Sequence, residues 1–511
     1  MKHLAVLLLL LVMTLQADVR LPAVFGSGML LQRNQPVPVW GFAAPAESVV
    51  VTFQKQLLRT VAGPDGRWRV TLQPLTEGGP YELTVNGRNS IRLTNILVGE
   101  VWLASGQSNM SFELEKDADG KNAVAASSLP NIRLFNVKRV LSDTLMDDVQ
   151  GKWQECSPSV AGDFSAVAFY FGRMLQDSLK VPVGLIHSSW GGTAAEGWMP
   201  RNVLEEAEDL RPILRRWMED SSAYPERIAS FNAELPALTV QWRKDSAEAV
   251  SLGRALPRKP TAPRGPGHRD TPSGQFNGML HPIIPFAIRG VIWYQGEGNA
   301  SRAHQYRRLF PALITTWRSL WGQGDFPFYY VQLPNLDRQP EPSRSGWAEL
   351  REAQLMTLAL PNTGMAVTID VGDPKDLHPT NKRPVGERLA RIALARTYGK
   401  NIAYAAPRMQ KANVAGKSII VDFEKNGEML TVLNGTTLKG FTIAGKDKKF
   451  VPATAVLQGN TVTVSSPLVK EPVAVRYAWA DNPTCNLYTV TGLPVGPFRS
   501  DVWPEVTAGK K

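Results

Sequence analysis

The feature that most constrains the fold is an alternation of apolar and amphipathic stretches between Ile96 and Lys400 of this 511-residue chain. Apolar runs predict strands over residues 96–104, 132–137, 183–188, 290–294, 328–333 and 365–371. Apolar residues at three- and four-residue steps predict helices over residues 164–179, 306–320, 350–360 and 385–398. Apolar strands that alternate with amphipathic helices form a parallel sheet covered on both faces, so we expect an α/β domain over residues 96–400.

Strand patterns without helices occupy both ends of the chain. From Val19 to about Asn95, β-branched runs flank turns such as Gly63-Pro-Asp-Gly66, which is typical of antiparallel hairpins. After Lys400, strand patterns return over residues 418–423, 429–433, 440–444, 453–457, 461–465 and 473–479. We therefore expect β-sandwich-like domains over residues 18–95 and 401–511, which flank the α/β domain.

One region interrupts the α/β rhythm. Residues 202–273 hold a long polar helical pattern, followed by a segment rich in Pro and Gly. Loops at the strand ends of such a domain commonly shape ligand sites. A solvated decoration is the favoured interpretation of this insertion, and a role in shaping the site is the alternative.

Residues 1–17 have the pattern of a secretory signal. Lys2 comes first, an apolar run covers Leu4 to Met13, and the small residue Ala17 ends the segment. The apolar run is too short to span a bilayer, and no later segment is long and apolar enough. We expect an exported, soluble protein without a membrane span, located in the periplasm or outside the cell.

The charge and the cysteines give limited information about the partners of this protein. The formal net charge is +11, yet the basic residues are scattered and never form a run of five. Because no nucleic-acid motif accompanies them, we expect the charge to favour solubility and expect no nucleic-acid partner. Cys156 and Cys485 either pair or remain separate buried thiols, and no metal-ligand spacing occurs.

A candidate nucleophile lies at the end of the first strand of the α/β domain. The segment Gly99–Met110 has the pattern of an apolar strand that runs into a glycine turn bearing Ser108. A serine just beyond the carboxyl end of a strand is a recurrent arrangement for nucleophiles, and ligands bind at that edge of open α/β sheets. The alternative is a capped loop with no catalytic role.

A serine nucleophile needs a general base, and the positions of the six histidines favour His378. Three of the others lie in the signal, in the Pro- and Gly-rich segment and beside arginines at a helix start: His3, His268 and His304. His187 ends a strand, where packing is an equal alternative, and His281 lies just before a strand, where lining a pocket is the alternative. His378 follows the last strand of the α/β domain in a loop that also holds three aspartates. A base at this strand end would lie on the same edge of the sheet as Ser108.

Two further strand ends supply donors for an oxyanion. Gly191 and Gly192 offer backbone amides, and Asn299 offers a side-chain amide. A glycine after a strand is usually only part of a turn. Polar clusters at four strand ends of one domain are a stronger signal, because the carboxyl ends of parallel strands share one edge. Together they predict acyl transfer by a serine nucleophile.

The four clusters, in this order, resemble those of the sialate O-acetylesterase family within the SGNH hydrolases. The matching blocks are Gly106-Gln-Ser108, Gly191-Gly192, Gly296-Glu-Gly-Asn299 and Asp376-Leu-His-Pro379. The resemblance covers nearly the whole mature chain. It implies a flavodoxin-like three-layer α/β/α domain that hydrolyses acetyl esters of sugars without a metal or cofactor.

The resemblance also implies roles for these residues. Ser108 is the nucleophile and His378 the base. The oxyanion and substrate contacts come from the Ser108 amide and from Gly191, Gly192, Asn299 and Gln107. The third member of the triad is less defined, because the wider superfamily has an aspartate three residues before the histidine, where this chain has Lys375. Asp376 is the favoured acid, Glu297 is its rival, and Asp373 is a further alternative.

An O-acetylated sugar is the substrate that the resemblance implies. Sialic acid is the favoured sugar, and an acetylated plant polysaccharide such as xylan is the alternative within the same chemistry. A glycan-binding protein built around an inactive hydrolase belongs to a different class. The presence of Ser108, His378 and Asn299 argues against that class.

Overall fold

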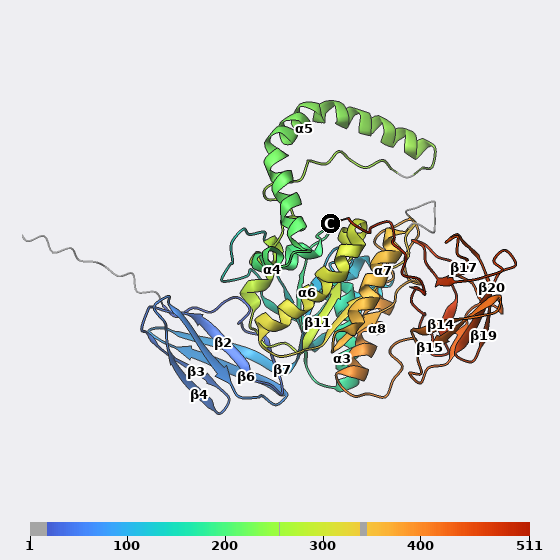
Figure 1. The fold of residues 1–511 in the computed structure, drawn as a ribbon. Coiled ribbons are helices and arrows are strands. Elements are labelled where there is room, and N and C mark those ends of the chain that lie inside the picture. Colours follow the sequence, from blue (N-terminus) through green and yellow to red (C-terminus); the bar gives the residue numbers. More distant parts are fainter. Residues whose placement is uncertain (1–17, 255, 338–344, 511) are drawn as a thin grey trace, which may run out of the picture.

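The computed structural model describes residues 18–254, 256–337 and 345–510, so the predicted signal, residues 1–17, lies outside the described residues. A central sheet lies between two β-rich units (Figure 1), with the strand order β13-β12-β11-β7-β10-β8-β9. Its strands are β7 (Ser90–Gly106), β8 (Leu129–Asn136), β9 (Trp153–Cys156), β10 (Val183–Ser189), β11 (Gly290–Tyr294), β12 (Phe328–Val331) and β13 (Thr363–Ala366). Neighbouring strands are parallel except β8 and β9.

The strand order determines where a site can form. β7 comes first in the sequence. β8 and β10, which follow it, lie on one side of β7 in the sheet, and β11, β12 and β13 lie on the other side. Ligands bind where the order reverses, which here is the carboxyl end of β7. The α/β class is confirmed. β7, the first parallel strand, lies between the third and the fourth, β10 and β11.

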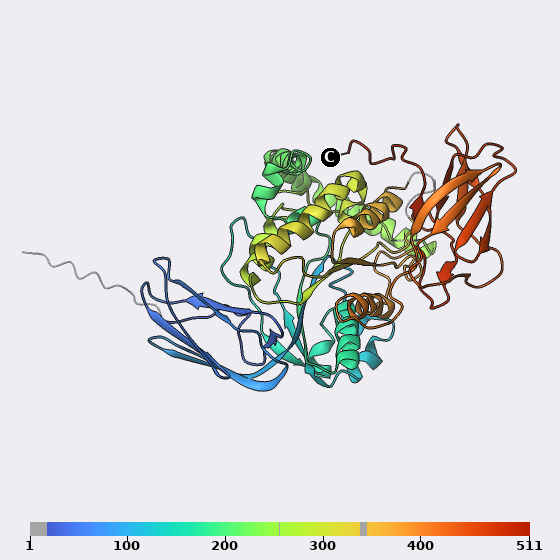
Figure 2. The same ribbon diagram turned by 60° about the horizontal axis from the view of Figure 1, so that its bottom comes forward.

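Helices cover both faces of the sheet (Figure 2). Those on one face are α3 (Ala166–Leu179) and α8 (Arg383–Arg396), and those on the other are α6 (Ala303–Trp321) and α7 (Gly346–Met356). Successive side chains of a strand point to opposite faces, so Trp102 and Ala104 join the core beneath α3 and α8, whereas Leu103 joins the opposite core. The four predicted helices are confirmed, with ends shifted by a few residues. Two short helices, α1 (Gly120–Ala125) and α2 (Pro158–Ala161), precede α3.

The N-terminal β-rich unit is continuous with the central sheet. It holds β1 (Leu30–Gln32), β2 (Val37–Phe42), β3 (Ser48–Phe53), β4 (Gln56–Val61), β5 (Arg67–Leu72) and β6 (Gly78–Asn86). The first part of β7 pairs antiparallel with β6, and its second part lies between β10 and β11. The expected boundary at residue 95 therefore falls inside one strand of 17 residues. This shared strand joins the N-terminal unit directly to the turn that carries Ser108.

The C-terminal β-rich unit lies on the other side of the central domain (Figure 1). It holds β14 (Met409–Ala415), β15 (Ser418–Phe423), β16 (Leu430–Val432), β17 (Phe441–Ala444), β18 (Phe450–Pro452), β19 (Thr454–Gln458), β20 (Thr461–Ser465), β21 (Ala474–Tyr477), β22 (Leu487–Thr489) and β23 (Phe498–Arg499). The six strands predicted here are confirmed. An ion pair of 2.7 Å between Arg499 Nε and Glu352 Oε1 of α7 joins this unit to the α/β domain.

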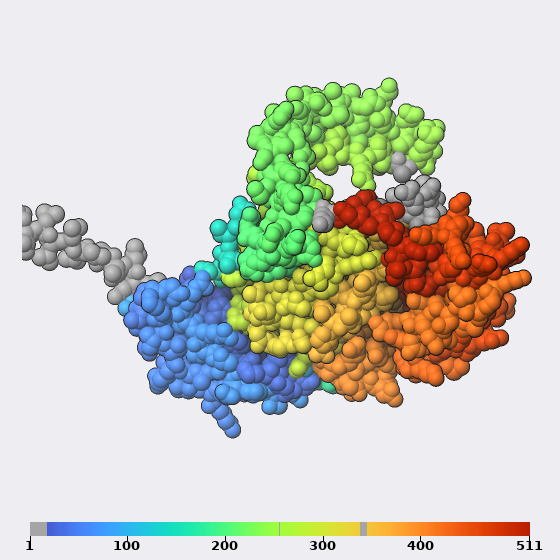
Figure 3. Space-filling view, viewed as in Figure 1, coloured from blue at the N-terminus to red at the C-terminus, as the bar shows by residue number. Residues whose placement is uncertain are grey.

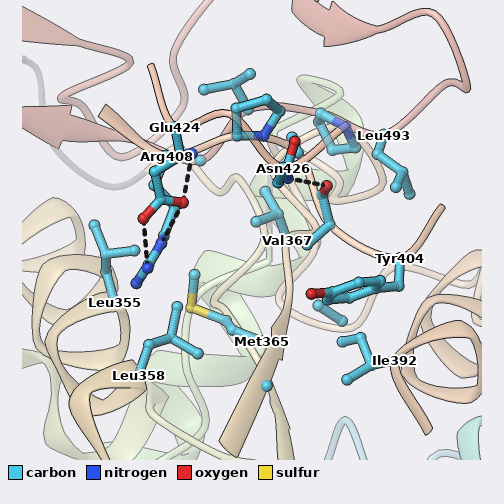
Figure 4. Close-up of a pocket in the computed structure, with 18 of the residues that line it drawn as sticks. Leu355, Leu358, Met365, Val367, Ile392, Tyr404, Arg408, Glu424, Asn426 and Leu493 are labelled. Carbon is cyan, nitrogen blue, oxygen red and sulfur yellow. Dashed lines mark hydrogen bonds and ion pairs between the residues drawn. The ribbon is translucent and has the colours of Figure 1, made fainter. Parts of the chain in front are cut away.

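A cavity lies at this junction (Figure 4). Apolar residues from both sides dominate its lining, among them Leu355, Leu358, Met365, Val367 and Leu493. Arg408 Nε donates to Glu424 Oε2 across 3.0 Å at its wall. No sequence-predicted site residue lines the cavity, so it is separate from the candidate active site.

The insertion forms an arm that stands away from the α/β domain (Figures 1 and 3). α4 (Arg201–Glu206) leads into α5 (Arg211–Ser251), a helix of 41 residues that contains Pro225 and Pro236. Proline removes an internal hydrogen bond and bends a helix, and α5 curves along its length. The predicted long polar helix is confirmed, and only Ile213, Leu214 and Ala249 of α5 are buried.

Two expectations about the whole chain concern the cysteines and membranes. Cys156 and Cys485 are free thiols, so the alternative of separate thiols holds. Burial raises the pKa of the Cys156 thiol to about 12. In the described ranges, no helix combines the length and apolar character that a membrane crossing requires.

Candidate active site

Ser108 lies in a tight turn at the point where the strand order reverses. β7 ends at Gly106, whose φ of 135° and close approach to Tyr294 require glycine, because a Cβ there would lie 2.2 Å from the Tyr294 carbonyl oxygen. The Gln107 N–H donates to that carbonyl at 3.0 Å, and the Met110 N–H donates back to Gln107 at 2.9 Å. Ser108 is half-buried at the apex of this turn. The turn is therefore fixed from both sides, and the serine is presented to solvent.

The loop after β10 lies against this turn. A Cβ on Gly191 would lie 3.2 Å from Ser108 Cβ, so a side chain at residue 191 would crowd the nucleophile. Among the described residues, the backbone N–H groups of Ser108, Gly191 and Gly192 donate to no protein acceptor. Unpaired N–H groups beside a nucleophile form an oxyanion hole when they point at the developing charge. The structure thus brings the first two predicted blocks together with free donors.

Gln107 and Asn299 are buried, each with 2% of its surface exposed. Gln107 Oε1 accepts the Gly298 N–H at 3.2 Å and so connects the serine turn to the third block. Asn299 Oδ1 accepts the Ala195 N–H at 3.0 Å and Gln295 Nε2 at 2.7 Å. Its Nδ2 donates to Glu196 Oε2 at 2.7 Å. These contacts make Asn299 a support for the loop after β10; Glu196 accepts one of the two Nδ2 hydrogens, and the oxyanion role of the side chain stays a prediction.

His378 lies on the loop after β13, with 39% of its side chain exposed. Its Nδ1 lies 3.9 Å from Asp376 Oδ1, which is too long for a hydrogen bond. The same oxygen accepts the His378 backbone N–H at 2.8 Å. Burial, followed by the positive charge of Lys382, lowers the pKa of His378, and the Asp376 carboxylate opposes this shift. His378 is therefore neutral at lower pH than an ordinary histidine, which suits a general base.

A buried chain of polar groups lies beside the serine turn. Asn109 Nδ2 donates to Glu297 Oε1 at 2.6 Å and to the Leu377 carbonyl at 3.1 Å. Lys382 Nζ donates to Asn109 Oδ1 at 2.5 Å. Leu377 immediately precedes His378, so Asn109 connects the nucleophile's turn to the loop of the base.

Burial dominates the electrostatics of this chain. It raises the pKa of Glu297 and lowers the pKa of Lys382 to about 7. Glu297 Oε2 is buried and has no hydrogen-bond partner among the described residues. Glu297 therefore positions Asn109 with one oxygen and has the other free. The third acid alternative, Asp373, accepts the Lys375 N–H at 2.8 Å and is exposed.

Two other histidines are held in structural contacts. His187 Nε2 lies 2.6 Å from Ser189 Oγ and its Nδ1 lies 2.8 Å from Asn136 Oδ1. Burial lowers the pKa of His187 to about 3. His281 Nδ1 lies 3.0 Å from the Met146 carbonyl. These contacts support the elimination that favoured His378.

Sequence reasoning missed Asn109 and Lys382. Asn109 directly follows the nucleophile, and a polar residue there was a usable signal. Lys382 lies at the start of α8, where a lysine normally points to solvent. Its burial depends on Asn109 and Asp117, which lie more than 260 residues away along the chain.

Comparison with known proteins gives the class. A family model described as carbohydrate esterase, sialic acid-specific acetylesterase matches residues 277–395. The solved structure of a carbohydrate acetylesterase from Xanthomonas citri is 38% identical, with a TM-score of 0.80, over 95% of this chain and 100% of that one. The sialate O-acetylesterase of Mus musculus is 29% identical over 93% of both chains, and that of Homo sapiens is 27% identical over 94% of this chain and 92% of that one.

These likenesses define the class: the chain is a carboxylic ester hydrolase with an α/β catalytic domain. More particularly, it belongs to the carbohydrate esterase family of sialic acid-specific acetylesterases.

Proposed function

We propose that this protein removes O-acetyl groups from a sugar with Ser108 as nucleophile and His378 as general base. The observation that carries the proposal is the set of unpaired N–H groups on Ser108, Gly191 and Gly192 around one half-buried serine. Ser108 and Gly191 are half-buried and Gly192 is exposed, so their free N–H groups are accessible to a substrate and can donate to the anion that develops beside the serine.

The reaction follows from this arrangement in two steps. Ser108 Oγ attacks the acetyl carbonyl carbon while His378 takes the hydroxyl proton, and the N–H groups bind the resulting oxyanion. The bond from the acetyl carbon to the sugar oxygen then breaks, and His378 donates its proton to that oxygen. Water, deprotonated by His378, attacks the acetyl-serine. The bond from the acetyl carbon to Ser108 Oγ then breaks, acetate leaves, and His378 returns the proton to Ser108 Oγ.

We assign Asp376 as the acid that orients His378, because its oxygen is 3.9 Å from the ring nitrogen. Catalytic hydrogen bonds are often long without substrate and shorten in the complex, and the assignment requires this pair to do so. Glu297 contacts Asn109 instead, and its role in the proposal is to position the loop of the base.

Sialic acid is the proposed sugar, and acetylated xylan is the alternative. The curated relatives from Mus musculus and Homo sapiens are sialate O-acetylesterases. The relative from Xanthomonas citri is a carbohydrate acetylesterase without a stated sugar. Acetate release from O-acetylated sialic acid, measured beside release from acetylated xylan, decides between them. Activity on xylan alone would replace sialic acid in this proposal.

The nucleophile is tested by Ser108→Ala with a generic aryl acetate. We expect turnover to fall by about 10³-fold or more, because removal of a nucleophile leaves only binding and the oxyanion hole. Ser319→Ala, an exposed serine on α6, is the matched control and keeps full activity. Unchanged turnover in folded Ser108→Ala would overturn the assignment.

We further propose that the protein is exported after removal of residues 1–17, and that the two β-rich units, residues 18–95 and 401–511, are sandwich-like domains. The apolar run after Lys2 supports the first statement, and the antiparallel pairing in both units supports the second. N-terminal sequencing of the protein recovered from its native compartment tests the export. A mature chain that begins at Met1 would contradict it.

A further inference from the structure

A polar pocket lies next to the oxyanion loop, and the insertion forms one of its walls. Gly192 and Gly298 line it on the side of the catalytic turn, and Arg216 and Trp217 of α5 line it from the arm. Its volume is about 170 Å³. Because Gly191 contacts Ser108, the pocket begins one residue away from the residue that touches the nucleophile.

The carboxylates of this pocket are already neutralised. Each has an arginine partner, with N–O distances of 2.7 Å for Glu196 and Arg302, 3.1 Å for Asp270 and Arg264, and 2.7 Å for Asp220 and Arg227. Arg216 is left over. In the part of the chain that the structure describes, it makes no ion pair and no hydrogen bond, and its Nη1 is buried.

An unpaired, half-buried guanidinium such as that of Arg216 lowers the free energy of unfolding. Burial, followed by the positive charge of Arg302, lowers the pKa of its guanidinium. A half-buried guanidinium gains most from a carboxylate, which accepts two parallel hydrogen bonds from its planar fork. The carboxylates of Glu196, Asp220 and Glu219 oppose this pKa shift, but none of them pairs with Arg216, so the pocket offers one positive charge without an ion-pair partner among the described residues.

A second guanidinium lies at the edge of the same loop. A Cβ on Gly192 would lie 2.7 Å from Arg269 Cζ, so the Arg269 side chain covers the backbone of residue 192. Gly192 also has a φ of 78°, a backbone conformation that favours glycine. Arg269 is exposed, and its guanidinium has no ion pair within the described residues. Both unpaired arginines belong to the insertion.

We propose that Arg216 and Arg269 are specificity-determining residues that bind the carboxylate of an acidic sugar while its acetyl ester lies at Ser108. This inference rests on the proposed deacetylation by Ser108. It assigns the insertion the role of substrate selection: the arm holds the acidic group next to the oxyanion loop. The chemistry selects any carboxylate-bearing sugar, either a sialic acid or a uronic acid, over a neutral one.

The test compares two substrates that differ only in charge. O-acetylated sialic acid and its carboxamide have the same acetyl ester, and the amide is not cleaved by ester hydrolysis. We expect wild-type kcat/KM to favour the acid by about 10- to 100-fold, the range of a charge-assisted hydrogen bond. In Arg216→Gln and Arg269→Gln this preference falls toward one, mainly through KM. Arg216→Lys, which has the charge but not the fork, recovers part of it.

Arg215→Gln is the matched control, since Arg215 is the exposed neighbour of Arg216 on α5, and it keeps the wild-type preference. Arg216→Gln removes no native hydrogen bond, so we expect it to fold, and its melting temperature verifies this. Equal kcat/KM for acid and carboxamide in the wild type, or an unchanged preference in both folded variants, overturns the subsite.

Three further outcomes separate the subsite from the proposed function. A wild-type preference for acetylated uronic acid over sialic acid supports the subsite and changes only the sugar. Full aryl acetate turnover in Ser108→Ala defeats the proposed function itself. If turnover still depends on Ser108 but the acid and its carboxamide have equal kcat/KM, only the proposed subsite is overturned.

Discussion

The turn of Ser108 and the loop of His378 supply the two reacting groups, yet the protein builds them in opposite ways. The turn follows a central strand, and the backbones of Tyr294 and Gln107 fix it. The loop follows the short strand β13, and its His378 and Asp376 side chains are 39% and 58% exposed. Its main buried attachment to the turn is one hydrogen bond, from Asn109 to the Leu377 carbonyl.

This difference indicates where precision is needed. The oxyanion donors are backbone groups, so the turn that presents them has to be rigid before substrate arrives. His378 first takes the hydroxyl proton of Ser108 and then donates it to the sugar oxygen. Some rotation of its ring is compatible with these two transfers. Asn109 limits that freedom, because it belongs to the rigid turn and holds the residue before His378.

The largest effect that tests the contrast is loss of the base. His378→Ala is expected to lower kcat for an aryl acetate by about 10²- to 10⁴-fold, the usual contribution of a general base. The backbone oxyanion donors stay in place here as they do in Ser108→Ala, so the two variants are expected to retain comparable residual activity. His304→Ala, an exposed histidine on α6, serves as the control and is expected to match wild type. A loss of less than tenfold in His378→Ala would remove it from the mechanism.

The next effect tests the connection between the two regions. Asn109→Ala breaks the contacts to Glu297, Lys382 and Leu377, and leaves buried groups without partners. We expect the free energy of unfolding to fall by about 1–3 kcal/mol for each group left unpaired. We expect kcat to fall by about 10²-fold, because small misplacements of a catalytic group have effects of that size.

Urea unfolding and steady-state kinetics on the same samples check both effects of Asn109→Ala. Asn122→Ala changes an exposed asparagine on α1 and provides the control. A stability loss with unchanged kcat would show that the base loop does not depend on Asn109.

The same contrast explains what the sequence could and could not predict. The turn lies at the end of an apolar strand, so the apolar run and the glycine turn after it were sufficient to predict the position of Ser108. The strand β11 was predicted with its observed bounds, Gly290–Tyr294. The strand expected over residues 365–371 ends at Ala366. Beyond it, Thr368 donates to the Gln332 carbonyl and Asp370 pairs with Arg388, so side-chain contacts replace strand pairing.

The features of the site that the sequence did not predict depend on contacts between segments that are far apart in the sequence. Asn299 was predicted only as an oxyanion donor, and its contact with Glu196, which accepts one of the two Nδ2 hydrogens, depends on how two loops meet. The favoured view of the insertion as solvated decoration holds for most of α5 and not for Arg216, which reaches the pocket from its first turns. Patterns within one element were sufficient for strands and helices. They carry no information about which buried charge is left unpaired.

A smaller effect concerns the acid behind His378. An exposed pair separated by 3.9 Å contributes no more than about 1 kcal/mol, so Asp376→Asn is expected to lower kcat by about fivefold. Glu297→Gln retains an oxygen that accepts from Asn109 and is expected to change kcat less. Parallel kinetics of the two variants rank them. If Glu297→Gln has the larger loss, the buried carboxylate is the orienting acid and Asp376 only shapes the loop.

The smallest effect is a shift in the pH profile. The base acts when His378 is neutral, so kcat/KM falls as pH drops through its pKa, and burial together with the charge of Lys382 places that midpoint below 6.5. The pKa of Lys382 is about 7, so Lys382 is charged in the range where His378 titrates. Lys382→Met removes this repulsion and is expected to move the midpoint upward by a fraction of a pH unit.

Substitution of Asp376, on the solvent side of His378, is expected to shift the midpoint of the pH profile in the opposite direction. Asp376 stabilises the charged ring, so Asp376→Asn is expected to move the midpoint further down, and Lys375→Met, an exposed lysine of the same loop, leaves it in place. Profiles of kcat/KM between pH 4 and 8 distinguish these cases. Opposite shifts in the two variants mean that the half-exposed loop is tuned from its buried side by Lys382 and from solvent by Asp376. A midpoint that responds to neither would assign the acid limb to a group other than His378.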